Sequence, residues 1–228
     1  APAAMFERLR AAGLDLELED LDGNTALFIA AKYNAPRAME TLLAMGARPS
    51  RRNAAGRSLL QEAMFMESDK AFKFVLERSR PGAAAAPGGE DLDASGPEWW
   101  RTSLHLAISE FLDPAVYIRP LLDAGADVRG PNDADQTPLQ YAILCENVAA
   151  IETLLHAEPA LVNEPLASSW TRTPLNLAVA EKKSVTLVRA LLDAGANAAE
   201  PDAHGHTALE LAIIYGEPSG KLLQTLLA

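Results

Sequence analysis

The stretch Thr137-Pro-Leu-Gln-Tyr-Ala142 decides the fold of this chain, because close copies of it recur along the sequence. The copies share a Thr or Ser at the first position, a Leu at the third and an Ala at the sixth. Their starts lie 33, 44, 35, 36 and 34 residues apart, at Thr25, Ser58, Thr102, Thr137, Thr173 and Thr207. A nearly constant period of this length indicates an array of stacked repeats.

A second motif, Leu-Leu-x-x-Gly-Ala, runs in phase with the first. Its copies occupy Leu42–Ala47, Leu121–Ala126 and Leu191–Ala196, and each glycine stands 12 residues before the next start. Gly13 stands at the same distance before Thr25. Two motifs that keep one phase over most of the chain predict that each period contains the same pair of structural elements.

Each motif has a physical reading. The Thr hydroxyl can cap the start of a short helix, and a following Pro sits where no intrahelical N–H is needed. The Leu-Leu pair ends a second helix, and the glycine supplies the left-handed residue that closes it. Polar turns such as Asp20–Asn24 then lead to the next unit. One helix pair cannot bury its apolar face alone, whereas stacked neighbours can.

These motifs resemble the ankyrin repeat, whose unit begins Thr-Pro-Leu-His-x-Ala and has a period of 33 residues. The resemblance implies an all-α fold, an ankyrin-repeat solenoid of stacked helix-turn-helix units with finger turns between them. We predict a single ankyrin-repeat domain over residues 1–228. It contains a half-repeat at 1–20 and repeats at about 20–52, 53–80, 97–131, 132–164, 168–201 and 202–228, with a loop insertion at 80–98.

Three segments depart from the pattern. The insertion at 80–98 is dense in Pro, Gly and Ala, and we interpret it either as a contact loop or as a tolerated surface insertion. Glu158-Pro159 replaces the Gly-Ala pair, which predicts an altered turn between repeats. The segment Leu222–Leu227 is an apolar final helix without a polar outer face, so further residues or another molecule would cover it.

Composition narrows the function classes. The net charge is −11, with 31 acidic and 20 basic side chains, so we predict no nucleic-acid partner. No apolar run approaches the ~20 residues that cross a bilayer, so we expect no membrane span. Cys145 is the single cysteine, which excludes an intrachain disulfide. We expect a monomer, either cytoplasmic or, if a signal peptide has been removed, periplasmic.

The sequence suggests no enzyme, metal site or cofactor. His105 occupies the His position of the repeat motif, where the family's imidazole bonds neighbouring backbone. His204 and His206 have no obvious third ligand, and Cys145 has no recognisable general base. The stretch Gly216–Lys221 has one residue too few between its glycines for a phosphate-binding loop and no preceding strand. We therefore predict a noncatalytic protein without cofactors.

The ankyrin resemblance implies that a partner binds a concave surface made of the finger turns and the ends of the first helices. Aromatic residues, Met and Arg are enriched in the centres of protein interfaces. The predicted partner-binding residues at this surface are Tyr33, Arg57, Phe65, Met66, Trp99, Arg101, Phe111, Gln136, Trp170, Arg172, His206 and Tyr215. The alternative is that these rings pack on adjacent fingers and stiffen the array.

The leading functional hypothesis is a protein–protein interaction module that binds its partner on the concave face. The acidic charge suits a basic partner, and an Ala-rich composition with more Arg than Lys favours a bacterial source. A sharper version is an inhibitor or immunity protein that blocks a bacterial enzyme or toxin. The alternative is a secreted bacterial effector that engages a host protein.

Overall fold

The structure is a computed structural model that describes residues 13, 15–80, 92–93, 102–109, 113–166, 173–215 and 220–227. These residues form α-helices and one short 3-10 helix, and the described segments contain no strand. The helices are α2 (Ala26–Lys32), α3 (Pro36–Ala44), α4 (Leu59–Phe65), α5 (Asp69–Ser79), α6 (Ser103–Ile108), α7 (Pro114–Asp123), α8 (Pro138–Leu144), α9 (Val148–Ala157), η1 (Pro159–Val162), α10 (Pro174–Ala180), α11 (Val185–Asp193), α12 (Ala208–Tyr215) and α13 (Gly220–Leu227). The predicted all-α repeat fold is confirmed.

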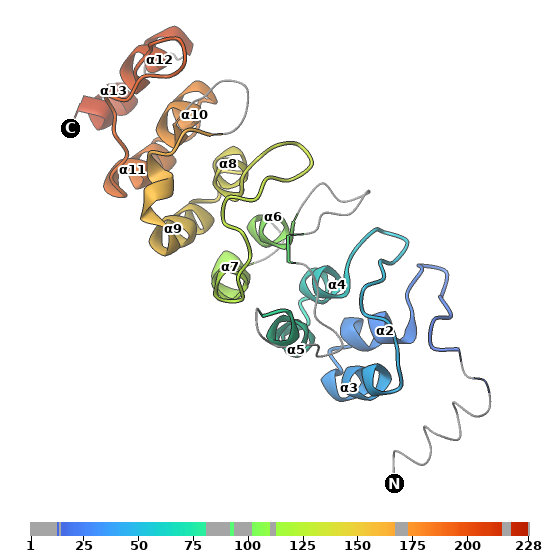
Figure 1. Cartoon of the computed structure of the whole chain (residues 1–228). Coiled ribbons are helices and arrows are strands. Elements are labelled where there is room, and N and C mark those ends of the chain that lie inside the picture. Colours follow the sequence, from blue (N-terminus) through green and yellow to red (C-terminus); the bar gives the residue numbers. More distant parts are fainter. Residues whose placement is uncertain are drawn as a thin grey trace. The chain divides into compact units, whose positions relative to one another are not determined.

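The chain divides into two compact units. The first unit comprises residues 1–103 and 123–126, and the second comprises residues 104–122 and 127–228. Within the first unit α2 pairs with α3 and α4 with α5, and the two pairs stack on each other (Figure 1). In the second unit α8, α10 and α12 pack in succession, each beside its own second helix (Figure 1). The single domain and its repeat boundaries stay predictions.

The Ser or Thr of the repeat motif stands directly before or at the start of each described first helix, and its side chain caps several of them. Ser58 and Thr137 each accept the backbone N–H three residues ahead and complete a capping box with Gln61 and Gln140. Thr25 makes no such side-chain bond, so the capping prediction is wrong at that position. Backbone geometry alone starts α2 there, since Thr25 has the same extended conformation as the other caps.

The core follows the two apolar positions of the motif. The Leu at the third position is almost completely buried in five of the copies, at Leu27, Leu60, Leu104, Leu139 and Leu175. The Ala at the sixth position is also buried and small, which lets neighbouring helices approach closely. None of the described helices is long and apolar enough to cross a membrane.

Two kinds of turn follow the second helices. Gly46 and Gly195 have φ values of 98° and 93°, which confirms the predicted left-handed closure. Where Glu158-Pro159 replaces the glycine, α9 ends at Ala157 and Pro159 starts the 3-10 helix instead. Asn163 then bonds the next repeat through both side-chain atoms, accepting from the Asn197 N–H at 2.7 Å and donating to the Gly195 carbonyl at 3.0 Å. The predicted alteration of this turn is confirmed.

Candidate protein-binding surface

In the part of the chain that the structure describes, four five-residue finger turns precede first helices, at 20–24, 53–57, 132–136 and 202–206. In each turn the first N–H donates to the fifth carbonyl at 2.9–3.1 Å, and the fourth N–H donates to the first carbonyl at 2.8–3.0 Å. The fourth residue has a positive φ in all four, and it is Gly in three of them and Asp135 in the other. Each turn is therefore a small closed ring of backbone hydrogen bonds.

The first residue of every described finger turn is Asp or Asn, and its side chain stiffens the turn. The Oδ1 atoms of Asp20, Asn53, Asn132 and Asp202 each accept the N–H of the fifth residue at 2.8–3.0 Å. The sequence predicted a finger turn before each Thr or Ser start, with 20–24 as the example, but not the role of this Asp or Asn side chain. The missed signal was an Asp or Asn five residues before four of the six Thr or Ser starts.

In the first unit the two finger turns contact each other directly. The Ala54 N–H donates to the Asp22 carbonyl at 3.0 Å, and Asn53 Nδ2 donates to Asn24 Oδ1 at 3.2 Å. A Cβ atom on Gly23 would lie 2.5 Å from the Ala54 nitrogen, so only glycine fits there. This close approach fixes the two turns as one wall.

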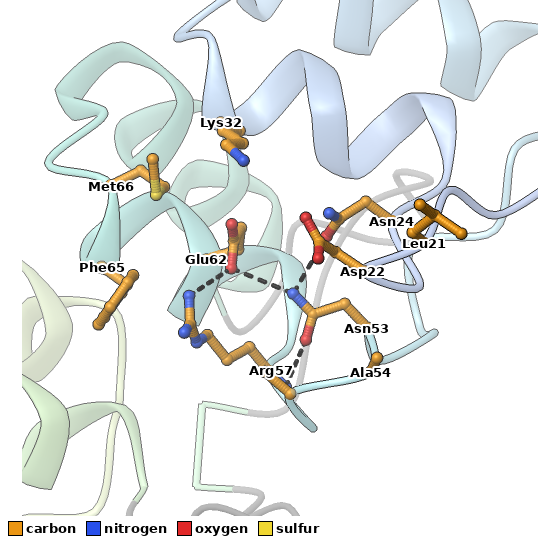
Figure 2. A pocket seen from close by; sticks show the side chains of 11 residues that line it. Leu21, Asp22, Asn24, Lys32, Asn53, Ala54, Arg57, Glu62, Phe65 and Met66 are labelled. Atoms are coloured by element: carbon orange, nitrogen blue, oxygen red, sulfur yellow. Dashed lines mark hydrogen bonds and ion pairs between the residues drawn. The ribbon is translucent and has the colours of Figure 1, made fainter.

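Behind this wall lies a groove of about 510 Å³ (Figure 2). The finger turns form one side, and the ends of α2 and α4 contribute Lys32, Phe65 and Met66 to the other. The structure thus brings together Arg57, Phe65 and Met66, three of the residues predicted to bind a partner. The lining mixes polar and charged side chains with the apolar Leu21, Phe65 and Met66, so the groove offers both kinds of contact to another molecule.

A buried ion pair organises the groove. Arg57 donates to Glu62 Oε2 at 2.8 Å, and the two side chains are only 14% and 5% exposed. The same oxygen accepts Asn53 Nδ2 at 3.1 Å (Figure 2). The Arg57 guanidinium also lies 3.6 Å from the centre of the Phe65 ring, a cation–π contact. Arg57 therefore holds the Glu62 and Phe65 side chains that line the groove, and Glu62 neutralises its positive charge.

Glu62 is not among the residues that the sequence predicted for the site, although the sequence contains a signal for it. Glu62 stands at the fifth position of its motif, where the other five copies carry Ile, Leu, Tyr, Leu and Leu. A carboxylate at a position that is otherwise large and mostly apolar indicates a charge that must find a partner inside the fold.

Large apolar side chains are exposed where the first helices of the first unit end. Tyr33 caps α2 and is 74% exposed, while Phe65 and Met66 at the end of α4 are 42% and 37% exposed. In the second unit Tyr215, the last residue of α12, is likewise exposed. These are the positions from which the sequence predicted contact with a partner, although contact itself stays a prediction.

The backbone carbonyl of Gln136 makes a hydrogen bond that stabilises the fold. Its carbonyl lies 2.8 Å from His105 Nε2, so the predicted bond between His105 and neighbouring backbone is confirmed. The His105 ring also lies against Tyr141, with ring centres 5.5 Å apart. The Gln136 side chain is half-buried and accepts a weak bond from Asn132 at 3.4 Å.

His206 lies in the finger turn beside His204, with the two rings stacked at 6.2 Å between centres. Each Nδ1 atom lies 3.8 Å from a carboxylate oxygen of the buried Asp202. Burial raises the pKa of Asp202, but the His206 and His204 N–H groups and the nearby imidazoles outweigh it and hold that pKa below its ordinary value. Within the described segments no group of three or more His, Cys, Asp or Glu residues is arranged to hold a metal ion.

The remaining predicted residues lie outside the described part of the chain. They are Trp99, Arg101, Phe111, Trp170 and Arg172, together with most of the 80–98 insertion. Cys145 is described and is half-buried at the end of α8.

Comparison with known proteins agrees with this geometry. A model of the ankyrin repeat matches residues 22–54. An ankyrin repeat protein of fowlpox virus (strain NVSL) is 32% identical over 130 residues, which cover 57% of this chain and 86% of that protein. The chain belongs to the ankyrin repeat family.

Solved ankyrin repeat domains share the fold. The Bcl-3 domain, from the IkappaB protein family, superposes with a TM-score of 0.78 at 24% identity, over 99% of this chain and 91% of that one. The human ASB11 domain gives 0.63 at 21% identity, over 97% and 90%. An Acinetobacter baumannii AYE domain gives 0.65 at 23% identity, over 88% and 95%.

Ankyrin repeats are generally protein–protein interaction modules, and they are typically noncatalytic. The fowlpox virus relative is viral, so the bacterial source favoured by the composition is not confirmed.

Proposed function

We propose that this ankyrin repeat chain is a noncatalytic module that binds a partner protein over its finger turns and first-helix ends. The observation that carries the proposal is the groove of the first unit, where Phe65 and Met66 are exposed beside a rigid wall of two finger turns. Exposed aromatic and Met side chains next to a preorganised polar rim are the usual make-up of an interface centre.

Charge supports a basic partner. Residues 104–228 contain 16 acidic and 7 basic side chains, against 15 and 13 in residues 1–103. A field of this sign speeds the approach of a positively charged protein and weakens with added salt. The partner's basic surface would therefore be drawn mainly by the second half of the chain.

The inhibitor or immunity role and the effector role are finer versions of this proposal. A basic enzyme that loses its activity when bound would support the first. A host protein held without loss of its activity would support the second.

A capture experiment tests the proposal. The intact chain and a Phe65→Ala/Met66→Ala variant are immobilised and exposed to lysate of the source organism, and specifically retained proteins are purified and titrated. We expect the double variant to weaken the interaction by at least about 30-fold, as for hot-spot residues.

Leu18→Ala is the matched control, because Leu18 is an exposed apolar residue of the same unit that does not line the groove. Circular dichroism must show that all variants stay folded. Equal affinity of a folded double variant and the intact chain would exclude the groove as the binding site.

A further inference from the structure

The groove of the first unit is lined by four charged side chains, and two of them neutralise each other. Arg57 and Glu62 form the buried ion pair at 2.8 Å. The other two are Lys32, which is half-buried, and Asp22, which is exposed. In the part of the chain that the structure describes, neither the Lys32 ammonium nor the Asp22 carboxylate forms an ion pair. Figure 2 shows the Lys32 side chain apart from the dashed network that joins Arg57, Glu62 and Asn53.

The backbone of Lys32 is fixed at the end of α2, and the fold supplies no counterion there. Its carbonyl accepts the Ser68 hydroxyl at 3.1 Å, and Ser68 is buried at the start of α5. Asp20 has its oxygens engaged by the Asp22 and Asn24 N–H groups at 3.0 and 2.8 Å and by the Asn24 side-chain amide at 3.3 Å. The Asn24 N–H is the main cause that lowers the pKa of Asp20, and the Lys32 charge is the smallest. Asp20 therefore does not serve as the counterion of Lys32.

A molecule that covers the groove must deal with the Lys32 charge. Lys32 lines the same groove as the exposed Phe65 and Met66 side chains, so apolar contact with these two displaces water from the ammonium as well. Removing that water costs free energy unless an acid takes its place. Asp22 lies exposed on the finger turn and keeps its water. The groove therefore favours an occupant that supplies a carboxylate beside an apolar side chain.

We propose that the groove binds a segment of the partner protein in which an Asp or Glu stands beside a large apolar residue. The carboxylate pairs with Lys32, and the apolar side chain packs on Phe65 and Met66. This inference rests on the proposed function and adds the chemistry of the bound segment. It agrees with a partner that is basic elsewhere, because the acidic excess lies in residues 104–228, whereas residues 1–103 contain 15 acidic and 13 basic side chains.

A random-peptide library tests the proposal without knowledge of the partner. Phage-displayed peptides are selected on the immobilised full chain, and those that also bind the Phe65→Ala/Met66→Ala variant are removed. The remaining peptides are synthesised and titrated by fluorescence anisotropy. We expect them to share an Asp or Glu next to a large apolar residue.

Lys32→Glu should weaken binding of these peptides by at least about 30-fold, because attraction becomes repulsion in a partly desolvated groove. Lys32→Gln, which removes only the charge, should weaken it by about tenfold. A peptide whose acid is replaced by Lys should regain binding to the Lys32→Glu chain, which also shows that this variant is folded. Lys70→Glu is the matched control, since Lys70 is an exposed lysine of the same unit that does not line the groove. It should change the affinity less than about threefold.

The outcomes separate this inference from the proposed function. Groove-dependent peptides that lack an acid, or that bind the Lys32→Glu chain equally well, would overturn the inference and leave the groove as the binding site. A selection in which no peptide depends on Phe65 and Met66 would overturn both. A dimer of the intact chain in sedimentation that Phe65→Ala/Met66→Ala dissolves would overturn the inference too, because the groove would then hold a second copy.

Discussion

The finger turns at 20–24 and 202–206 have the same backbone hydrogen bonds and the same Asp at the first position, yet their surroundings differ. The first turn packs against the turn at 53–57, and a Cβ on Gly23 would strike the Ala54 backbone. A Cβ on Gly205 would meet no atom within 4 Å. The same local motif thus gives two turns that differ in whether a side chain fits at the glycine. The difference comes from the adjacent finger turn, which is present beside Gly23 and, among the described residues, not beside Gly205.

The comparison extends to charge. In the first unit the acid of the groove, Glu62, is buried and paired with Arg57. In the second unit the buried acid, Asp202, is held by backbone N–H groups with two half-exposed imidazoles nearby. A carboxylate can be stabilised inside a repeat by a cation or by N–H groups, but the consequences of removing it differ.

The largest expected effect is at Glu62. Glu62→Leu should lower the free energy of unfolding by about 3 kcal/mol, because it leaves the Arg57 guanidinium buried without its acid. Urea unfolding checks this. Glu210→Gln in the second unit is the control, since this exposed carboxylate accepts from the Thr207 N–H and hydroxyl and should be replaced with little change. Similar losses in both variants would remove the distinction between the units.

The two glycines test the comparison itself. Gly23→Ala should cost about 2–3 kcal/mol, because left-handed strain adds to the clash with Ala54, whereas Gly205→Ala should cost about 1 kcal/mol from strain alone. Thermal and urea unfolding of the two variants measure the difference. If both lose the same amount, the contact between finger turns contributes nothing.

Lowering the pH should destabilise the second unit by protonating Asp202. Its pKa is lowered in the folded chain, so its stabilising contribution is complete above the ordinary value of 3.8 and disappears as the pH falls through the lower, folded pKa. Asp202→Asn should therefore lose less stability than the unmodified chain between pH 5 and pH 2. Asp20→Asn in the first unit should have a weaker effect, because Asp20 is exposed and bonds chiefly the Asn24 N–H. Identical pH profiles for Asp202→Asn and the unmodified chain would contradict this account.

The smallest expected change in stability should be the same in both units. Glu67 and Lys182 follow α4 and α10 with φ values of 51° and 54°, a left-handed conformation that favours glycine. Glu67→Gly and Lys182→Gly should each stabilise by about 0.5–1 kcal/mol in urea unfolding. A gain in one unit only would show that the inter-helix turns also depend on their neighbours.

The sequence predicted the elements that depend on local chemistry. Thr137-Pro138 marked the start of α8, the Gly-Ala pair marked the end of α11, and Glu158-Pro159 marked an altered turn. The role of His105 also followed from its place in the repeat motif, where the ankyrin resemblance implied a bond to neighbouring backbone. The candidate site was predicted less completely, since exposure and pairing of side chains depend on several segments at once.

Sequence alone therefore determined the all-helical repeat, its register and the left-handed closures, because capping, backbone strain and apolar periodicity act over a few residues. Tertiary structure alone decided that Arg57 pairs with Glu62, that Gly23 has no room for a side chain, and that Lys32 lies half-buried in the same groove as Phe65 and Met66. These features arise where one repeat meets the next, and identical motifs acquire different environments there from the neighbours they pack against.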